Sequence, residues 1–125
     1  MILYLTLGTN DPARAIRFYD AALAPLGIGR RVTEDDEAGY GLPGDGRCRF
    51  WITRPFDGKP ASVGNGSMPA FVAPDQAAVR AFHAAGLAAG GKDEGAPGLR
   101  PYGPAFYAAY LRDPDGNKLS AVHEG

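Results

Sequence analysis

Apolar and polar residues alternate at the start of the chain. The three leucines of residues 2–8 fall on one side of an extended segment, while Tyr4 and Thr6 fall on the other. From residue 12 to residue 26 the period changes, and apolar side chains return every three or four positions. These two periods predict a strand that is followed by an amphipathic helix.

Both ends of this helix carry residues that favour a helix boundary. Asn10 or Asp11 can accept a hydrogen bond from the first turn, and Pro12 is tolerated there because the first helical N–H groups have no partner. Gly27 follows the last apolar position and is suited to ending the helix. The helix is therefore predicted between Pro12 and Gly27.

The same pattern returns 64 residues later. Residues 5–27 align with residues 69–91, with an aspartate before each helix (Asp11 and Asp75) and a glycine after it. A repeated strand, capped helix and glycine predict two similar modules in one domain, with a site between them.

Further strand candidates complete each module. The first continues as a three-strand meander, and the second ends in two apolar runs around residues 113–117, where Asp-Gly is typical of a hairpin. The predicted strands are residues 2–8, 27–33, 38–43, 47–53, 67–73, 105–113 and 118–124.

The Pro- and Gly-rich stretches are predicted to be loops. Residues 55–66 are interpreted as the linker between module one, residues 1–60, and module two, residues 67–123. Residues 92–104 are predicted to form a loop that acts as a lid over one mouth of the site.

Composition limits the class of protein. A chain of 125 residues has the length of one domain, residues 1–125. The net charge is −1 with mixed signs, so we expect no nucleic-acid partner, and no apolar run approaches the ~20 residues of a membrane helix. The single Cys48 cannot form an internal disulfide, so we expect a cytoplasmic protein.

The order of elements and three segments resemble the vicinal oxygen chelate superfamily, which includes glyoxalase I, bleomycin-resistance proteins and extradiol dioxygenases. The segments are residues 11–26 (DPARAIRFYDAALAPL), 73–91 (APDQAAVRAFHAAGLAAGG) and 110–122 (YLRDPDGNKLSAV). The resemblance implies an α+β fold of two tandem βαβββ modules. These form a cup-shaped mixed sheet with the helices on its outer face, and the cup is often completed in a homodimer.

Metal-dependent members of this superfamily carry ligands at fixed positions, which the resemblance places at Tyr4, Met68, Ser120 and, within one residue, Trp51. Those members carry His, His and Glu at the first three positions, and an acidic residue or Gln at the fourth in some of them. Tyr4 and Met68 are 64 residues apart, so the repeat makes them equivalent. A hard divalent cation prefers carboxylate or imidazole donors, so we expect no metal cofactor.

Two interpretations of these side chains stay open. Tyr4, Trp51 and Met68 either fill the cup as core residues or line a pocket for a flat organic ligand. The remaining candidates are Arg54, which can bind a carboxylate or simply end a strand in solvent, and two aromatic residues suited to stacking. The predicted ligand-binding residues are Tyr4, Trp51, Arg54, Met68, Phe106, Tyr110 and Ser120.

Other reactive side chains are interpreted as structural. His83 lies on the second predicted helix beside an apolar position, His123 lies near the C-terminus, and Cys48 lies within a strand. No Ser-His-Asp or Cys-His arrangement for nucleophilic catalysis is recognisable.

Three functions are compatible with these residues. The first is a metal-independent protein of the bleomycin-resistance type that binds a small apolar or aromatic molecule. The alternative is a metal-dependent lyase, isomerase or dioxygenase of the glyoxalase superfamily. A third is an enzyme without metal in which Tyr4 or Tyr110 transfers a proton, which requires a nearby cation to lower the tyrosine pKa.

Overall fold

The computed structural model describes all 125 residues and contains two βαβββ modules. The first module contains β1 (Leu5–Gly8), α1 (Pro12–Leu23) with a short 3-10 turn η1 (Ala24–Leu26), β2 (Gly29–Thr33), β3 (Glu37–Gly41) and β4 (Phe50–Thr53). The second contains β5 (Ala70–Val72), α2 (Gln76–Ala88), β6 (Lys92–Leu99), β7 (Phe106–Arg112) and β8 (Lys118–Glu124). The predicted α+β class and the tandem modules are confirmed.

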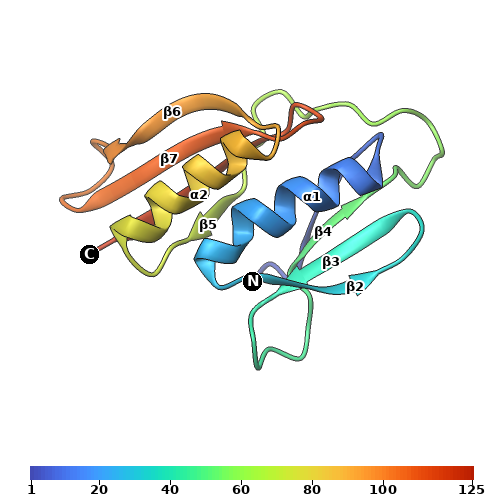
Figure 1. Cartoon of the computed structure of the whole chain (residues 1–125), viewed down its shortest axis with the longest axis horizontal. Helices are drawn as coiled ribbons and strands as arrows, with labels where there is room; N and C mark the ends of the chain where they lie inside the picture. Colours follow the sequence, from blue (N-terminus) through green and yellow to red (C-terminus); the bar gives the residue numbers. More distant parts are fainter.

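Each module forms its own four-stranded mixed sheet (Figure 1). The strand order is β1-β4-β3-β2 in the first sheet and β5-β8-β7-β6 in the second. In both, the first strand pairs in parallel with the last, and the other pairs are antiparallel. The repeat seen in the sequence is therefore a repeat of topology.

The helix boundaries follow from the capping residues. The Asp11 side chain accepts a hydrogen bond from the Arg14 N–H, and Asp75 accepts one from the Ala78 N–H. Gly27 ends the first helical segment with φ = 77°, a left-handed conformation that favours glycine. Of the two predicted caps for α1, Asp11 is the one used.

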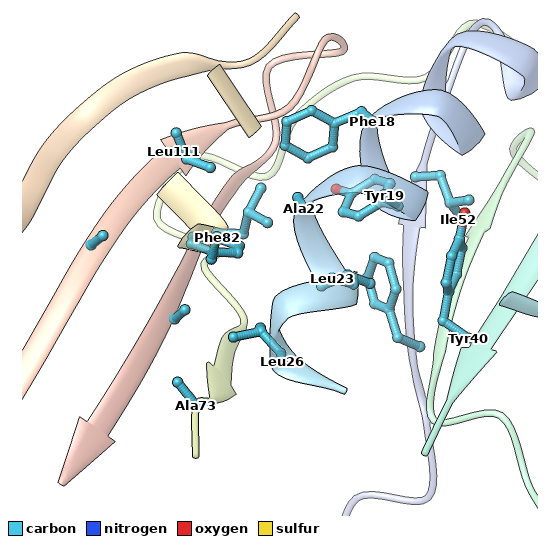
Figure 2. Packing of buried hydrophobic residues seen from close by; sticks show 14 of the residues in the cluster. Phe18, Tyr19, Ala22, Leu23, Leu26, Tyr40, Ile52, Ala73, Phe82 and Leu111 are labelled. Carbon is cyan, nitrogen blue, oxygen red and sulfur yellow. The ribbon is translucent and has the colours of Figure 1, made fainter. Parts of the chain in front are cut away.

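The two helices lie between the two sheets and pack against each other (Figures 1 and 2). Side chains of α1 reach both ways, because Tyr19 lies near Tyr40 of β3 while Phe18 lies close to α2 and Leu111 of β7. The two modules thus share one buried cluster of 18 apolar residues. Each helix covers one face of its sheet, and we call the other face of each sheet its open face.

The prediction of a lid loop over residues 92–104 was wrong, because residues 92–99 form strand β6. This strand contains Gly95, Pro97 and Gly98, and its pairing with β7 is interrupted by two register shifts. Such a composition is typical of a loop, and it hid the period of two that marks a regular strand. Only the short connection between Leu99 and Phe106 remains a loop.

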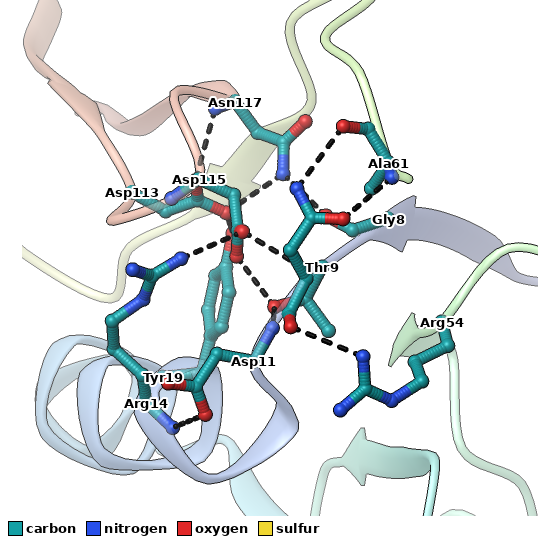
Figure 3. Close-up of polar contacts among 11 residues, drawn as sticks. Gly8, Thr9, Asp11, Arg14, Tyr19, Arg54, Ala61, Asp113, Asp115 and Asn117 are labelled. Atoms are coloured by element: carbon teal, nitrogen blue, oxygen red, sulfur yellow. Dashed lines mark hydrogen bonds and ion pairs between the residues drawn. The ribbon is translucent and has the colours of Figure 1, made fainter. Parts of the chain in front are cut away.

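The turn between β7 and β8, residues 113–117, joins the second module to the first (Figure 3). The Asp113 carboxylate is 2% exposed and accepts a hydrogen bond from the Tyr19 hydroxyl at 2.5 Å. It also accepts hydrogen bonds of 2.9 Å from the Asp115 N–H and from the N–H and Nδ2 of Asn117. Burial raises the pKa of Asp113 above its ordinary value, and the hydrogen bonds from Tyr19 and Asn117 oppose that shift.

The same turn holds the start of α1. Asp115 accepts a hydrogen bond from Thr9 Oγ1 at 2.5 Å and forms an ion pair with Arg14 at 2.9 Å. Asn117 Nδ2 donates to the Gly8 carbonyl at 2.9 Å (Figure 3). The predicted hairpin is confirmed, and it also fixes the orientation of one module relative to the other.

Neither helix combines the length and the apolar character needed to cross a bilayer.

We expect Asp113→Ala to lower the free energy of unfolding by about 3 kcal/mol, since it leaves several buried donors without an acceptor. Urea denaturation followed by circular dichroism measures the change. Asp35→Ala is the matched control, because Asp35 is exposed and its side chain makes no hydrogen bond. A loss at position 113 no larger than that of the control would contradict the role assigned to this turn.

Candidate functional site

The four positions related to metal ligands occupy equivalent places in the two modules. Trp51 pairs with Thr6 in the first sheet, and Ser120 pairs with Ala70 in the second. Thr6 and Ala70 are 64 residues apart, as are Tyr4 and Met68. The strand register therefore makes Trp51 equivalent to Ser120, in agreement with the alignment based on the repeat.

A cavity of about 630 Å³ lies on the open face of the first sheet, and we call it the first-sheet cavity. Tyr4 and Trp51 are its two aromatic residues, and the Tyr4 side chain is half exposed. The complete lining is Tyr4, Thr6, Arg31, Val32, Glu37, Gly46, Arg47, Cys48, Trp51 and Thr53.

The indole of Trp51 lies flat over Gly39 of the neighbouring strand β3. A Cβ atom at position 39 would lie 2.9 Å from two carbons of the indole ring and 2.9 Å from Sγ of Cys48. Glycine is therefore required at this position if the ring is to form the floor of the cavity.

The second sheet has a different arrangement on its open face. The Tyr110 ring lies close to Gly95 and between two cations, with the Arg100 guanidinium carbon 5.3 Å and Lys118 Nζ 5.7 Å from the ring centroid. Tyr110 pairs with Ser120, whose hydroxyl is buried without a hydrogen-bond partner. The aromatic residue is thus on β7 in this sheet, whereas it is on β4 in the first.

Met68 does not line the first-sheet cavity. It borders a second hollow of about 700 Å³ between the edge strands β1 and β5, which we call the edge groove. This groove is mainly apolar and includes Ile2, Leu42 and Val72. Within one chain, therefore, Tyr4 and Met68 do not face each other across one cavity.

The other predicted site residues lie apart from the first-sheet cavity. Arg54 forms an ion pair with Asp36 at 3.2 Å and donates to the Asn10 carbonyl at 3.1 Å, so its guanidinium is used in local structure (Figure 3). Phe106 packs edge-to-face against Tyr102 at 5.4 Å near the end of β7. Arg54 therefore does not supply a cation to Tyr4 or Tyr110.

The two histidines interact with structural groups. His83 is 9% exposed and its Nε2 lies 2.9 Å from a carboxylate oxygen of Asp93, and this contact lowers the pKa of Asp93. His123 Nδ1 lies 3.0 Å from the Ala73 carbonyl oxygen. Cys48 is buried and borders the first-sheet cavity beside Trp51.

The side chains do not fit a divalent metal centre of the kind that the superfamily implies. The four related positions offer a phenol, an indole, a thioether and a hydroxyl. Hard divalent cations prefer carboxylate and imidazole donors, and nowhere in the chain do three or more His, Cys, Asp or Glu side chains gather as such a set.

Several residues of the cavity were not predicted from the sequence. Arg31, Glu37 and Arg47 join Trp51 only because β2, β3 and the loop before β4 fold onto the same open face. The signal was present in β3, where Glu37, Gly39 and Gly41 alternate with buried Ala38 and Tyr40. Two glycines at alternate positions of a strand indicate that other side chains lie over it.

These features define an α+β protein made of a duplicated βαβββ module with a cavity on one open sheet face. The family model of the Glyoxalase/Bleomycin resistance protein/Dioxygenase superfamily matches residues 1–120. The chain belongs to this superfamily.

Solved structures agree with this assignment. A glyoxalase/bleomycin resistance protein from Albidiferax ferrireducens T118 is 43% identical, with a TM-score of 0.85 over 98% of this chain and 97% of that one. A glyoxalase-related enzyme from Fulvimarina pelagi is 19% identical, with a TM-score of 0.76 over 98% and 87%. A lactoylglutathione lyase from Agrobacterium tumefaciens is 20% identical, with a TM-score of 0.66 over 98% and 92%.

The last two similarities concern the fold alone. No curated protein matches this chain.

We expect Gly39→Ala to move the Trp51 indole, because the added Cβ overlaps the ring. The cost in stability should be about 1–3 kcal/mol, as for other overpacked sites. Trp51 is the only tryptophan, so its fluorescence maximum and its quenching by acrylamide report the movement directly. Gly29→Ala, where a Cβ meets no atom within 4 Å, is the control, and unchanged fluorescence in Gly39→Ala would refute the contact.

Proposed function

We propose that this protein binds a small apolar or aromatic molecule, without a divalent metal, on the open face of its first sheet. The observation that carries the proposal is the pair Tyr4 and Trp51. They stand where metal-dependent relatives carry ligands, yet here they line a cavity of about 630 Å³. A volume of this order is typical of small-molecule sites, which generally lie within about 300–1,000 Å³.

The exposure of these side chains favours binding over core packing. Tyr4 is 50% exposed and Trp51 is only partly buried, whereas Tyr19 and Tyr40 on the covered side are fully buried. A partly exposed indole held by Gly39 offers a rigid flat surface to a ring. The similarity to a bleomycin resistance protein in the 43% identical structure supports the same class of function.

A cytoplasmic location belongs to the same proposal. The thiol of Cys48 is buried and unpaired, which is compatible with a reducing compartment.

We expect naphthylmethanol, an uncharged flat probe, to bind and to raise the melting temperature, since a ligand that binds only the folded state stabilises it. Trp51→Leu should weaken the binding about tenfold, because it removes the stacking surface. Isothermal titration calorimetry measures both proteins. Phe56→Leu is the matched control, because Phe56 is fully exposed in the linker.

Two results would contradict the proposal. If no uncharged or charged naphthalene probe binds, the cavity is not a site for aromatic ligands. If zinc, nickel, manganese or iron binds stoichiometrically in equilibrium dialysis and is lost in Tyr4→Phe or Met68→Leu, the protein is metal-dependent, and the alternative of a metal-dependent lyase, isomerase or dioxygenase takes its place.

We further propose that the chain forms a homodimer. Seven of its twelve exposed large hydrophobic residues lie in the N-terminal segment or at the edge groove: Met1, Ile2, Leu3, Tyr4, Leu42, Met68 and Val72. An apolar surface of this kind between two unpaired sheet edges is suited to burial against another copy. Such a partner would also cover the open sheet faces and enclose the ligand.

We expect Val72→Asp to convert the dimer into a monomer, because Val72 is 83% exposed and a charge there is costly only if the surface becomes buried. Multi-angle light scattering after gel filtration gives the mass. Phe56→Asp, which changes an exposed apolar residue in the linker, should leave the mass unaltered. A monomeric native protein would overturn the proposal.

A further inference from the structure

The first-sheet cavity carries charges that specify the ligand further than its aromatic lining does. This inference rests on the function proposed above. We propose that the ligand is an elongated, flat molecule with an anionic group at one end and a positively charged, hydrogen-bond-donating group at the other.

Three levels of the open face define the long axis of the cavity. Glu37 pairs with Thr53 at one end, and Gly39 pairs with Trp51 in the middle. At the other end, Gly41 is covered by the carbonyl of Arg47 and the Cδ of Arg31. Four residues of strand separate Glu37 from Gly41, which is about 13 Å.

The end near Gly41 holds cationic groups that are available to a ligand. The Arg47 side chain lines the cavity and makes no hydrogen bond or ion pair. Arg31 uses only Nη1, which donates to the Leu42 and Asp45 carbonyls, so its other guanidinium nitrogens have no partner. These nitrogens suit a carboxylate, which a guanidinium binds through two parallel hydrogen bonds.

The nearest carboxylate at this end does not neutralise them. Asp45 accepts both of its side-chain ion-pair contacts from Arg49, at 2.9 and 3.4 Å. The hydrogen bond from Arg49 lowers the pKa of Asp45, so this carboxylate stays ionised and committed to Arg49. The positive charge facing the cavity therefore exceeds what its own loop balances.

The opposite end is acidic. Glu37 lines the cavity, is partly buried, and its carboxylate makes no hydrogen bond or ion pair. The neighbouring Asp36 is already paired with Arg54, while Glu34 and Asp35 add negative charge beside Glu37. A positively charged donor placed here gains a charge-assisted hydrogen bond and relieves repulsion among the carboxylates.

The two ends are too far apart to satisfy each other. A separation of about 13 Å exceeds the Debye length of about 8 Å at physiological ionic strength, and the indole of Trp51 lies between them. Only a molecule that spans the indole reaches both ends. A ligand with one charge would gain at one end and leave the other unpaired.

Four naphthalene probes test this inference by calorimetry: naphthylmethanol, a naphthalene carboxylate, naphthylmethylamine, and an aminomethyl naphthalene carboxylate with its two groups at opposite ends of the ring system. We expect the last to bind at least tenfold more tightly than any of the others. Arg47→Gln should weaken the two carboxylate-bearing probes about tenfold and spare naphthylmethanol. Glu37→Gln should do the same to the two amine-bearing probes.

Arg17→Gln and Glu34→Gln are the matched controls for net charge. Arg17 is exposed on α1 and Glu34 lies beside Glu37, and neither residue lines the cavity. Neither substitution should change the order of affinities. An effect of Glu34→Gln equal to that of Glu37→Gln would mean that the whole acidic turn acts as a diffuse field, which would overturn the assignment of Glu37.

The outcomes separate this inference from the function on which it rests. If all four probes bind equally and only Trp51→Leu weakens them, the cavity binds rings without reading charge, so the inference fails and the proposed function stands. If no probe binds, both fail. If the carboxylate probe alone matches the probe with both groups, the acidic end has no role in recognition and the inference is wrong.

Discussion

A carboxylate placed in a protein interior costs several kcal/mol unless donors surround it. Asp113 meets this condition with donors from two modules, since its own turn supplies backbone and amide N–H groups and α1 supplies the Tyr19 hydroxyl. Because Tyr19 is also fully buried against Tyr40 and Phe50 of the first sheet, the position of the hydroxyl fixes how the modules meet. The shared core and the outward direction of both open faces follow from this arrangement (Figure 2).

The fold was largely predictable because a duplication doubles each signal. Asp11 and Asp75 mark both helices, and alternating residues mark β1, β7 and β8. Strand β6 was missed because Gly95, Pro97 and Gly98 bend it and interrupt its pairing, so local composition suggested a loop. The contact between Tyr19 and Asp113 could not be predicted, since the two residues are 94 positions apart and no local pattern links a helix to a distant turn.

The candidate site was predicted in part. Tyr4 and Trp51 do share a cavity, and the register of β4 and β8 agrees with the equivalence of Trp51 and Ser120. A repeat, however, establishes equivalence and not proximity, so it could not show that Met68 borders a different hollow. The two faces have also diverged in side-chain volume, with Gly39 opposite Trp51 in one sheet and Tyr110 opposite Ser120 in the other.

The contact made by residues 113–117 runs in one direction only. The second module inserts its turn at the start of α1, while the corresponding loop of the first module binds its own residues through Asp45 and Arg49. The peptide between the modules contributes little to this join, since residues 54–69 contain no helix or strand. The two halves, supplied as separate polypeptides, should therefore recognise each other as unlike partners, as though an ancestral pair of identical chains had been fused and then each copy had taken a different role.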